Sequence, residues 1–186
     1  ICSAPGAMTL VTYATGAGAA IMWLDGGNWR RGALLPIMRP YMLVDRESFV
    51  HVFGLALNKR DVLHFTSRQP GNVEEFDKGE WVYRRNYSAA AVDSEDTLYY
   101  FGAALEDFGF RRRPRGGAWS ETVRLIDGWR IYPGVVCKGS SVHVVYCGWN
   151  PIPALYEGVY YLESRDRGAT WQTSEGTKLR LPIARN

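Results

Sequence analysis

The stretch VYYLESRDRGATW, residues 159–171, decides the fold because its first half occurs twice in the chain. Its first seven residues align position by position with VLHFTSR at residues 62–68, and both copies have the pattern of a strand. A polar loop follows each copy and ends in an aromatic residue, Phe76 in one case and Trp171 in the other. A strand, a loop and an aromatic residue that recur together indicate a repeated fold.

The same unit can be followed through the rest of the chain. Strand-like segments of similar pattern begin at Met8, Ser48, Thr97 and Ser141. The loops that follow the third strands end at Trp29, Phe76, Trp119 and Trp171. First strands carry an Arg-x-Tyr motif in RPYMLV, RNYSAAAV and RIYPGVV, so that Tyr41, Tyr87 and Tyr132 recur at intervals of 46 and 45 residues. A unit of about 45 residues with four short strands has the size of a β-propeller blade.

We therefore predict an all-β propeller segment with four antiparallel strands in each blade. The expected blades are residues 1–40, 41–86, 87–131 and 132–186 of a single segment, with chain ends that fall near blade boundaries. The abundance of aromatic residues and the 20 glycines agree with many short strands joined by tight turns. We expect these blades to belong to a larger propeller of six or seven blades, and a closed four-bladed ring is the alternative.

Composition narrows the range of partners. The net charge is only +3, and the one basic cluster, RRRPR at residues 111–115, has no nucleic-acid motif beside it, so no nucleic-acid partner is expected. The longest apolar runs are too short to cross a membrane. Three cysteines leave the redox compartment open, and no ligand cluster of recognisable spacing predicts a metal or another cofactor.

Five residues at the end of the repeated strand and in the loop after it form a recognisable motif. Ser164, Asp166, Gly168, Thr170 and Trp171 fit Ser-x-Asp-x-Gly-x-Thr-Trp, which resembles the Asp-box of the bacterial neuraminidase repeat, or BNR repeat. A structural role follows from the residue types. Asp166 can accept hydrogen bonds from its own loop, Gly168 can adopt a positive φ, and Trp171 can pack between blades.

A second resemblance covers about three quarters of the chain. Residues 49–76 resemble a blade of a BNR-repeat family that includes ulvan-lyase-like polysaccharide lyases. The resemblance implies a secreted or periplasmic protein that acts on an acidic polysaccharide, with Tyr87 at the family's strand tyrosine. The chain departs from the pattern at Leu57, where the family has histidine. The family's arginine falls near Gly102 or Ala103 here, so the catalytic set is incomplete.

The Arg-x-Tyr motifs supply the candidate binding residues, because innermost strands begin near one face of a propeller's channel. Convergent arginines and aromatic rings suit the carboxylate and the ring of an acidic sugar. The expected substrate-binding residues are Arg39, Tyr41, Arg85, Arg130 and Tyr132. The alternative is that these arginines brace neighbouring blades. His64 is a further catalytic candidate, although its place in an apolar strand favours packing.

Three functions follow from these patterns, and the residues leave open whether the protein is an enzyme. The first is a uronate-directed polysaccharide lyase in which Tyr87 is the acid or base and Arg85 or Arg130 binds the carboxylate. The second is a non-catalytic module that binds glycan or protein. A sialidase-like hydrolase is third, because WRIYP at residues 129–133 is better explained as part of the repeat than as a sialidase motif. The expected partners are an acidic polysaccharide and the remaining blades of the same propeller.

Overall fold

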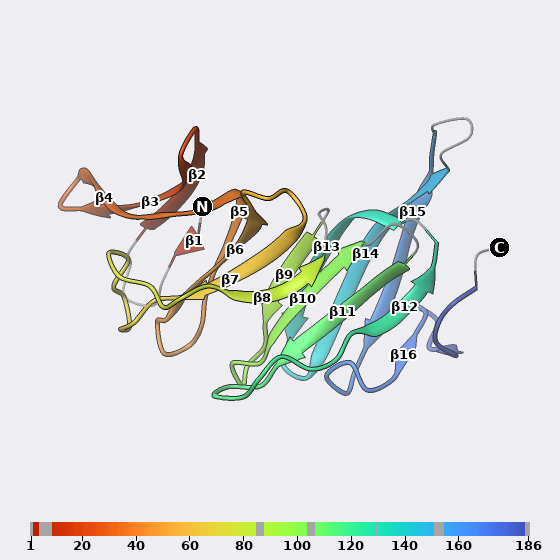
Figure 1. Ribbon diagram of the computed structural model, residues 1–186. Coiled ribbons are helices and arrows are strands. Elements are labelled where there is room, and N and C mark those ends of the chain that lie inside the picture. Colours follow the sequence, from red (N-terminus) through yellow and green to blue (C-terminus); the bar gives the residue numbers. More distant parts are fainter. Residues whose placement is uncertain are drawn as a thin grey trace. The chain divides into compact units, whose positions relative to one another are not determined.

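The computed structural model describes residues 2–3, 9–84, 88–103, 107–128, 130–150 and 155–184, and every regular element in these ranges is a β-strand. The chain divides into two compact units, Ile1–Arg85 and Asn86–Asn186, each of which contains two antiparallel sheets (Figure 1). No helix within the described ranges is long and apolar enough to cross a membrane.

Unit 1 holds the first two sheets. In spatial order, the first consists of β1 (Cys2–Ser3), β2 (Thr9–Thr15), β3 (Gly18–Asp25) and β4 (Asn28–Leu35). The second consists of β5 (Ile37–Val44), β6 (Val50–Ala56), β7 (Asp61–Thr66) and β8 (Glu80–Arg84). Strands that are consecutive in the chain are neighbours in the sheet, which is the topology of a propeller blade.

Unit 2 repeats this arrangement. Its first sheet consists of β9 (Ser88–Val92), β10 (Leu98–Ala103), β11 (Asp107–Arg113) and β12 (Val123–Asp127). Its second consists of β13 (Arg130–Lys138), β14 (Ser141–Asn150), β15 (Leu155–Ser164), β16 (Trp171–Gln172) and a fifth strand, β17 (Lys178–Leu179). The all-β class and the blade-like sheets predicted from the repeat are confirmed.

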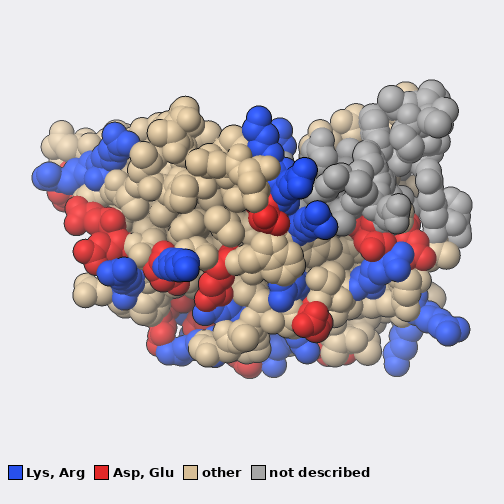
Figure 2. Space-filling model, viewed as in Figure 1, with Lys and Arg blue, Asp and Glu red and all other residues tan. Residues whose placement is uncertain are grey.

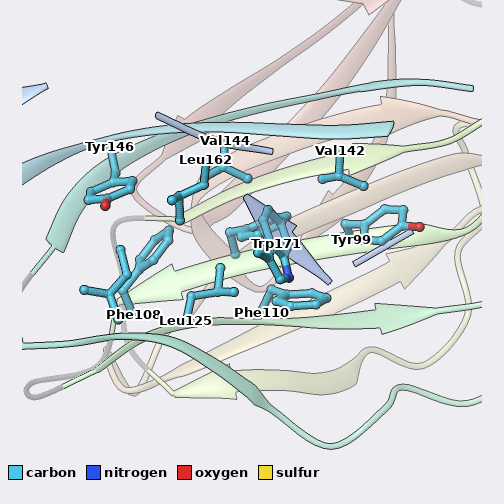
Figure 3. Packing of buried hydrophobic residues seen from close by; sticks show 11 residues of the cluster. Tyr99, Phe108, Phe110, Leu125, Val142, Val144, Tyr146, Leu162 and Trp171 are labelled. Atoms are coloured by element: carbon cyan, nitrogen blue, oxygen red, sulfur yellow. The ribbon is translucent and has the colours of Figure 1, made fainter. Parts of the chain in front are cut away.

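An aromatic core holds the two sheets of unit 2 together (Figure 3). Trp171, which is only 1% exposed, meets Phe101 and Phe110 edge-on, with ring centroids 6.1 and 5.4 Å apart. Val144 and Leu162 of the second sheet pack in the same cluster. Burial of large apolar side chains is the main stabilising contribution to such a core. Trp171, on the fourth strand of sheet β13–β17, therefore stabilises the packing of this sheet against sheet β9–β12.

The opposite face of the last sheet has a different environment. Cross-strand pairing places Val145 opposite Tyr161, as it places Phe101 opposite Phe110 in the preceding sheet. The two positions therefore correspond, yet Phe101 is fully buried whereas Val145 is 44% exposed. Val159, on the same face, is 75% exposed. Sheet β13–β17 thus presents apolar side chains to solvent where the sheet before it is covered.

Candidate functional site

The first strands of two blades contain a bulge at the same place. Pairing between β5 and β6 shifts register between Met38 and Tyr41, and pairing between β13 and β14 shifts between Ile131 and Gly134. The bulged residues with positive φ are Arg39 (50°) and Tyr132 (54°), and a proline follows each. β-Bulges redirect side chains and are common beside functional sites, so this position is a candidate for ligand contact.

The bulges correct the alignment of the repeat. Arg39 occupies the position that Tyr132 has in the later blade, and Tyr41, opposite Phe53, corresponds to Gly134, opposite Val145. The two Arg-x-Tyr motifs are therefore offset by two residues. The two blades have the bulge at the same position of the first strand, but different residues of the Arg-x-Tyr motif occupy it.

The predicted site residues are distributed over both units. Arg39 and Tyr41 are exposed in β5 of unit 1, and Tyr132 is exposed in β13 of unit 2. The backbone of Arg130 pairs with Gly148, but its side chain lies outside the described part of the structure. Arg85 and Tyr87 also lie outside the described residues.

Two histidines of unit 1 form a buried chain of hydrogen bonds. Asp45 Oδ2 lies 3.2 Å from His51 Nε2, and His51 Nδ1 lies 3.1 Å from His64 Nε2. In the tautomer of a neutral His51 that donates from Nε2 to Asp45, Nδ1 is an acceptor, and it can accept a hydrogen bond from His64 Nε2. Burial acts to raise the pKa of Asp45, but the hydrogen bonds from His51 and the Phe49 amide outweigh it and lower the pKa.

His64 is therefore placed as a packed residue. It is 1% exposed, and its ring stacks on Phe53 with centroids 4.4 Å apart. A general acid or base must come within hydrogen-bonding distance of the substrate, and almost none of the His64 ring is accessible from solvent. This placement favours the packing role that the sequence pattern also favoured.

A second polar network lies on the exposed face of sheet β13–β17. His143 Nδ1 lies 2.6 Å from the Tyr161 hydroxyl, which donates to Glu163 Oε2 at 2.9 Å. Gln172 Nε2 and Arg165 Nε donate to the other carboxylate oxygen at 2.6 and 2.8 Å. The hydrogen bonds from Gln172, then from Tyr161 and Arg165, lower the pKa of Glu163, whereas burial and then the bond to Glu163 raise the pKa of Tyr161.

These shifts decide what the network can do chemically. A general base works best with a pKa near the working pH, but Glu163 is shifted away from neutrality and stays ionised. Tyr161 keeps its proton because its pKa is raised. The network is thus a fixed acceptor surrounded by donors, and this arrangement favours structural anchoring over proton transfer.

Two exposed tyrosines lie side by side on the sheet that contains the bulged strand β13. Tyr132 and Tyr156 are 52% and 58% exposed, with ring centroids 5.9 Å apart and planes inclined by 40°. The Tyr156 hydroxyl lies 3.5 Å from that of Tyr132. Sequence reasoning identified Tyr132 but missed Tyr156, which belongs to the aromatic-rich segment LYEGVYY at residues 155–161.

The turn at residues 164–171 has a dense internal network. Asp166 Oδ1 accepts from the Thr170 amide at 2.8 Å, Asp166 Oδ2 accepts from the Thr170 hydroxyl at 2.6 Å, and the Gly168 amide donates to Ser164 Oγ at 2.7 Å. Gly168 has φ +83°, and a Cβ there would lie 2.9 Å from Phe110 Cζ. These three hydrogen bonds join residues of the turn to one another, which favours a structural role for it.

The basic run RRRPR at residues 111–115 also makes hydrogen bonds within the protein. Arg111, Arg112 and Arg113 donate to the backbone carbonyls of Ser120, Arg167 and Gly117. Figure 2 shows basic and acidic side chains interspersed on the visible face of the described residues. Within those residues, no group of three or more His, Cys, Asp or Glu side chains could hold a metal ion.

Comparison with solved structures identifies the fold as that of a β-propeller. A polysaccharide lyase described as an ulvan lyase matches with a TM-score of 0.75 and 18% identity, over 98% of this chain and 55% of that one. An endo-arabinanase from Bacillus licheniformis matches with a TM-score of 0.60 and 10% identity, over 94% of this chain and 74% of that one.

A third similar structure is an α-L-arabinofuranosidase from Fusarium graminearum, with a TM-score of 0.63 and 16% identity over 95% of this chain and 66% of that one. The chain thus spans about half the length of the ulvan lyase chain. No protein-family model matches the chain, and no curated protein matches it either.

Proposed function

We propose that this chain is part of a carbohydrate-active propeller that acts on or binds an acidic polysaccharide, most like a uronate-directed polysaccharide lyase. The observation that carries the proposal is the match of 98% of the chain to a solved ulvan lyase with a TM-score of 0.75. The Asp-box-like turn at residues 164–171 supports its assignment to the BNR-repeat propellers.

The proposed chemistry is β-elimination at a uronate. A base removes the C5 proton, the electron pair forms the C4–C5 double bond, and an acid protonates the departing 4-O oxygen. Tyr87 is the proposed acid or base, with Arg85 or Arg130 on the carboxylate, whose charge an arginine can neutralise through two parallel hydrogen bonds. Arg39, Tyr41 and Tyr132 are the proposed binding residues, and His64 is given only a packing role.

We also propose that the four blades belong to a larger propeller. The chain spans 55% of the ulvan lyase chain, which leaves room for further blades in a protein of similar length. The exposed valines on sheet β13–β17 support this proposal, since large exposed apolar patches commonly mark an interface.

The lyase proposal is tested by the absorbance of unsaturated uronates formed from ulvan and from glucuronan. We expect Tyr87→Phe to lower the rate by roughly 100-fold or more, because positioned acid–base groups contribute about 10²–10⁴-fold. Tyr13→Phe removes the same atom from an exposed tyrosine of β2 and is the control. An unchanged rate in Tyr87→Phe would exclude Tyr87, and no product from the wild type would exclude the lyase activity.

Non-catalytic glycan binding is the second candidate, and the histidines favour it. His51 and His64 are buried and bonded to each other, and His143 is hydrogen-bonded to Tyr161. We interpret these contacts as structural, so the second candidate assigns no histidine as a catalytic base. Retardation of the protein in gels that contain ulvan, without unsaturated product, would support this candidate over the lyase.

A further inference from the structure

The exposed pair Tyr132 and Tyr156 has a geometry that packing does not require. More than half of each side chain is accessible to solvent, although an apolar ring gains most free energy when it is buried. Tyr132 keeps a positive φ, which costs a non-glycine residue about 1–2 kcal/mol. Strain of this kind at an exposed position is typical of functional sites.

Two bulges interrupt the strands that carry the pair, β13 and β15, which lie on either side of β14. One lies in β13 between Ile131 and Gly134, and the other interrupts the pairing of β14 with β15 between Cys147 and Gly148. The first directs Tyr132, and the second precedes the row in which Tyr156 is paired. The rings meet at 5.9 Å with their hydroxyls 3.5 Å apart, so they form one continuous aromatic surface.

We infer that Tyr132 and Tyr156 form a stacking subsite for the apolar face of a pyranose ring in a polysaccharide. This inference rests on the proposed carbohydrate-directed function and adds a residue, Tyr156, and a mode of contact. The electron-rich face of a phenol ring attracts the polarised C–H bonds of a sugar, and the two hydroxyls can exchange hydrogen bonds with sugar hydroxyls.

This mode of contact has a distinctive consequence. The pair carries no formal charge, so its contribution to affinity is independent of the carboxylate of the sugar. An arginine that contacts the carboxylate contributes only when the sugar is charged, and its contribution weakens as salt screens the charge. The subsite therefore distinguishes polysaccharides by the shape of their rings and leaves recognition of the charge to other residues.

The test compares, by affinity electrophoresis, the affinity for ulvan with that for carboxyl-reduced ulvan, which keeps the backbone and the sulfate esters but lacks the uronate carboxylates. We expect Tyr156→Ala to weaken binding of both polymers by the same factor, about tenfold, as for a contact worth about 1.4 kcal/mol. Tyr156→Phe keeps the ring and should lose much less. Tyr13→Ala, at an exposed tyrosine of unit 1, should change neither affinity.

Thermal melting of each variant shows whether the fold is intact, and Tyr132→Ala, which removes the other ring of the pair, keeps the test valid if Tyr156→Ala is unstable. Equal affinity of wild type and Tyr156→Ala would overturn the inference, as would a loss restricted to the polymer that keeps its carboxylates. Failure of the wild type to bind either polymer would also overturn it. Binding of both polymers without unsaturated product would refute the lyase proposal alone and leave the subsite intact.

Discussion

Gly168 and Gly176 provide a matched test of how the last blade is fastened to its neighbour. Both have φ +83°, but a Cβ on Gly168 would lie 2.9 Å from Phe110 Cζ, whereas a Cβ on Gly176 would meet nothing within 4 Å. Alanine at either position incurs the cost of a left-handed backbone, about 1–2 kcal/mol. Only Gly168→Ala also forces the buried Phe110 ring to move.

The additional cost can be estimated from known overpacked cores. Inserting one methyl group into a well-packed interior costs about 1–3 kcal/mol, so we expect Gly168→Ala to be about 2 kcal/mol less stable than Gly176→Ala. For a chain of 186 residues this corresponds to a melting temperature lower by about 4–8 °C. Urea unfolding should give a lower midpoint with an unchanged slope, as expected for a change in stability alone.

Phe110→Leu in both backgrounds completes the test. A smaller side chain at position 110 makes room for the new methyl group, so the double variant should be more stable than the sum of the single effects predicts. Equal losses of stability in Gly168→Ala and Gly176→Ala would refute the reasoning, because the backbone cost alone would then explain both.

Three further predictions follow from the described contacts. Trp171→Ala should lower the free energy of unfolding, measured in urea, by about 3–5 kcal/mol. Trp29→Ala, at a tryptophan that is 49% exposed, should have little effect. Equal losses of stability in the two variants would contradict the assignment of Trp171 to the core. The pKa of Glu163 is lower in the folded protein than in the unfolded chain. The stability that its carboxylate contributes is therefore complete above the unfolded pKa of about 4.3 and is lost as the pH falls through the folded pKa. Melting curves of Glu163→Gln should lack this part of the acid destabilisation. Burial, and then the charge of Asp93, raise the pKa of Cys137 to about 12. Iodoacetamide at pH 8 should therefore not label Cys137 in the folded protein. Alkylation of this thiol without denaturant, detected by mass spectrometry, would contradict its placement.

The repeat made the blades predictable because strand, turn and aromatic residue recur together. It did not predict which repeated letters are equivalent in space. Arg39 and Tyr132 occupy equivalent bulges of different sheets although they are different letters of the motif, since cross-strand hydrogen bonds set the register. Trp29 follows a short Gly-Gly turn and is exposed, whereas Trp171 follows a longer turn and is buried.

The candidate site was only partly predictable for the same reason. Tyr156 was missed because its proximity to Tyr132 depends on two bulges and on the pairing of three strands. The buried contact of Asp45 with His51 had a signal that could have been used. Asp45 precedes His51 by six residues and lies within hydrogen-bonding distance of its Nε2, and Asp93 precedes Tyr99 by six residues and accepts a hydrogen bond from its hydroxyl.

The dependence of the Phe110 surface on Trp171 has a consequence for biosynthesis. Trp171 lies 61 residues after Phe110, so the ribosome exposes one side of this contact well before the other. At about 5–20 residues per second the delay is roughly 3–12 s. During this interval Phe101 and Phe110 lack the side chain that later covers them, and the nascent chain offers an aromatic surface to chaperones or to other nascent chains. Translation speed between these two residues should therefore influence how much soluble protein a cell obtains.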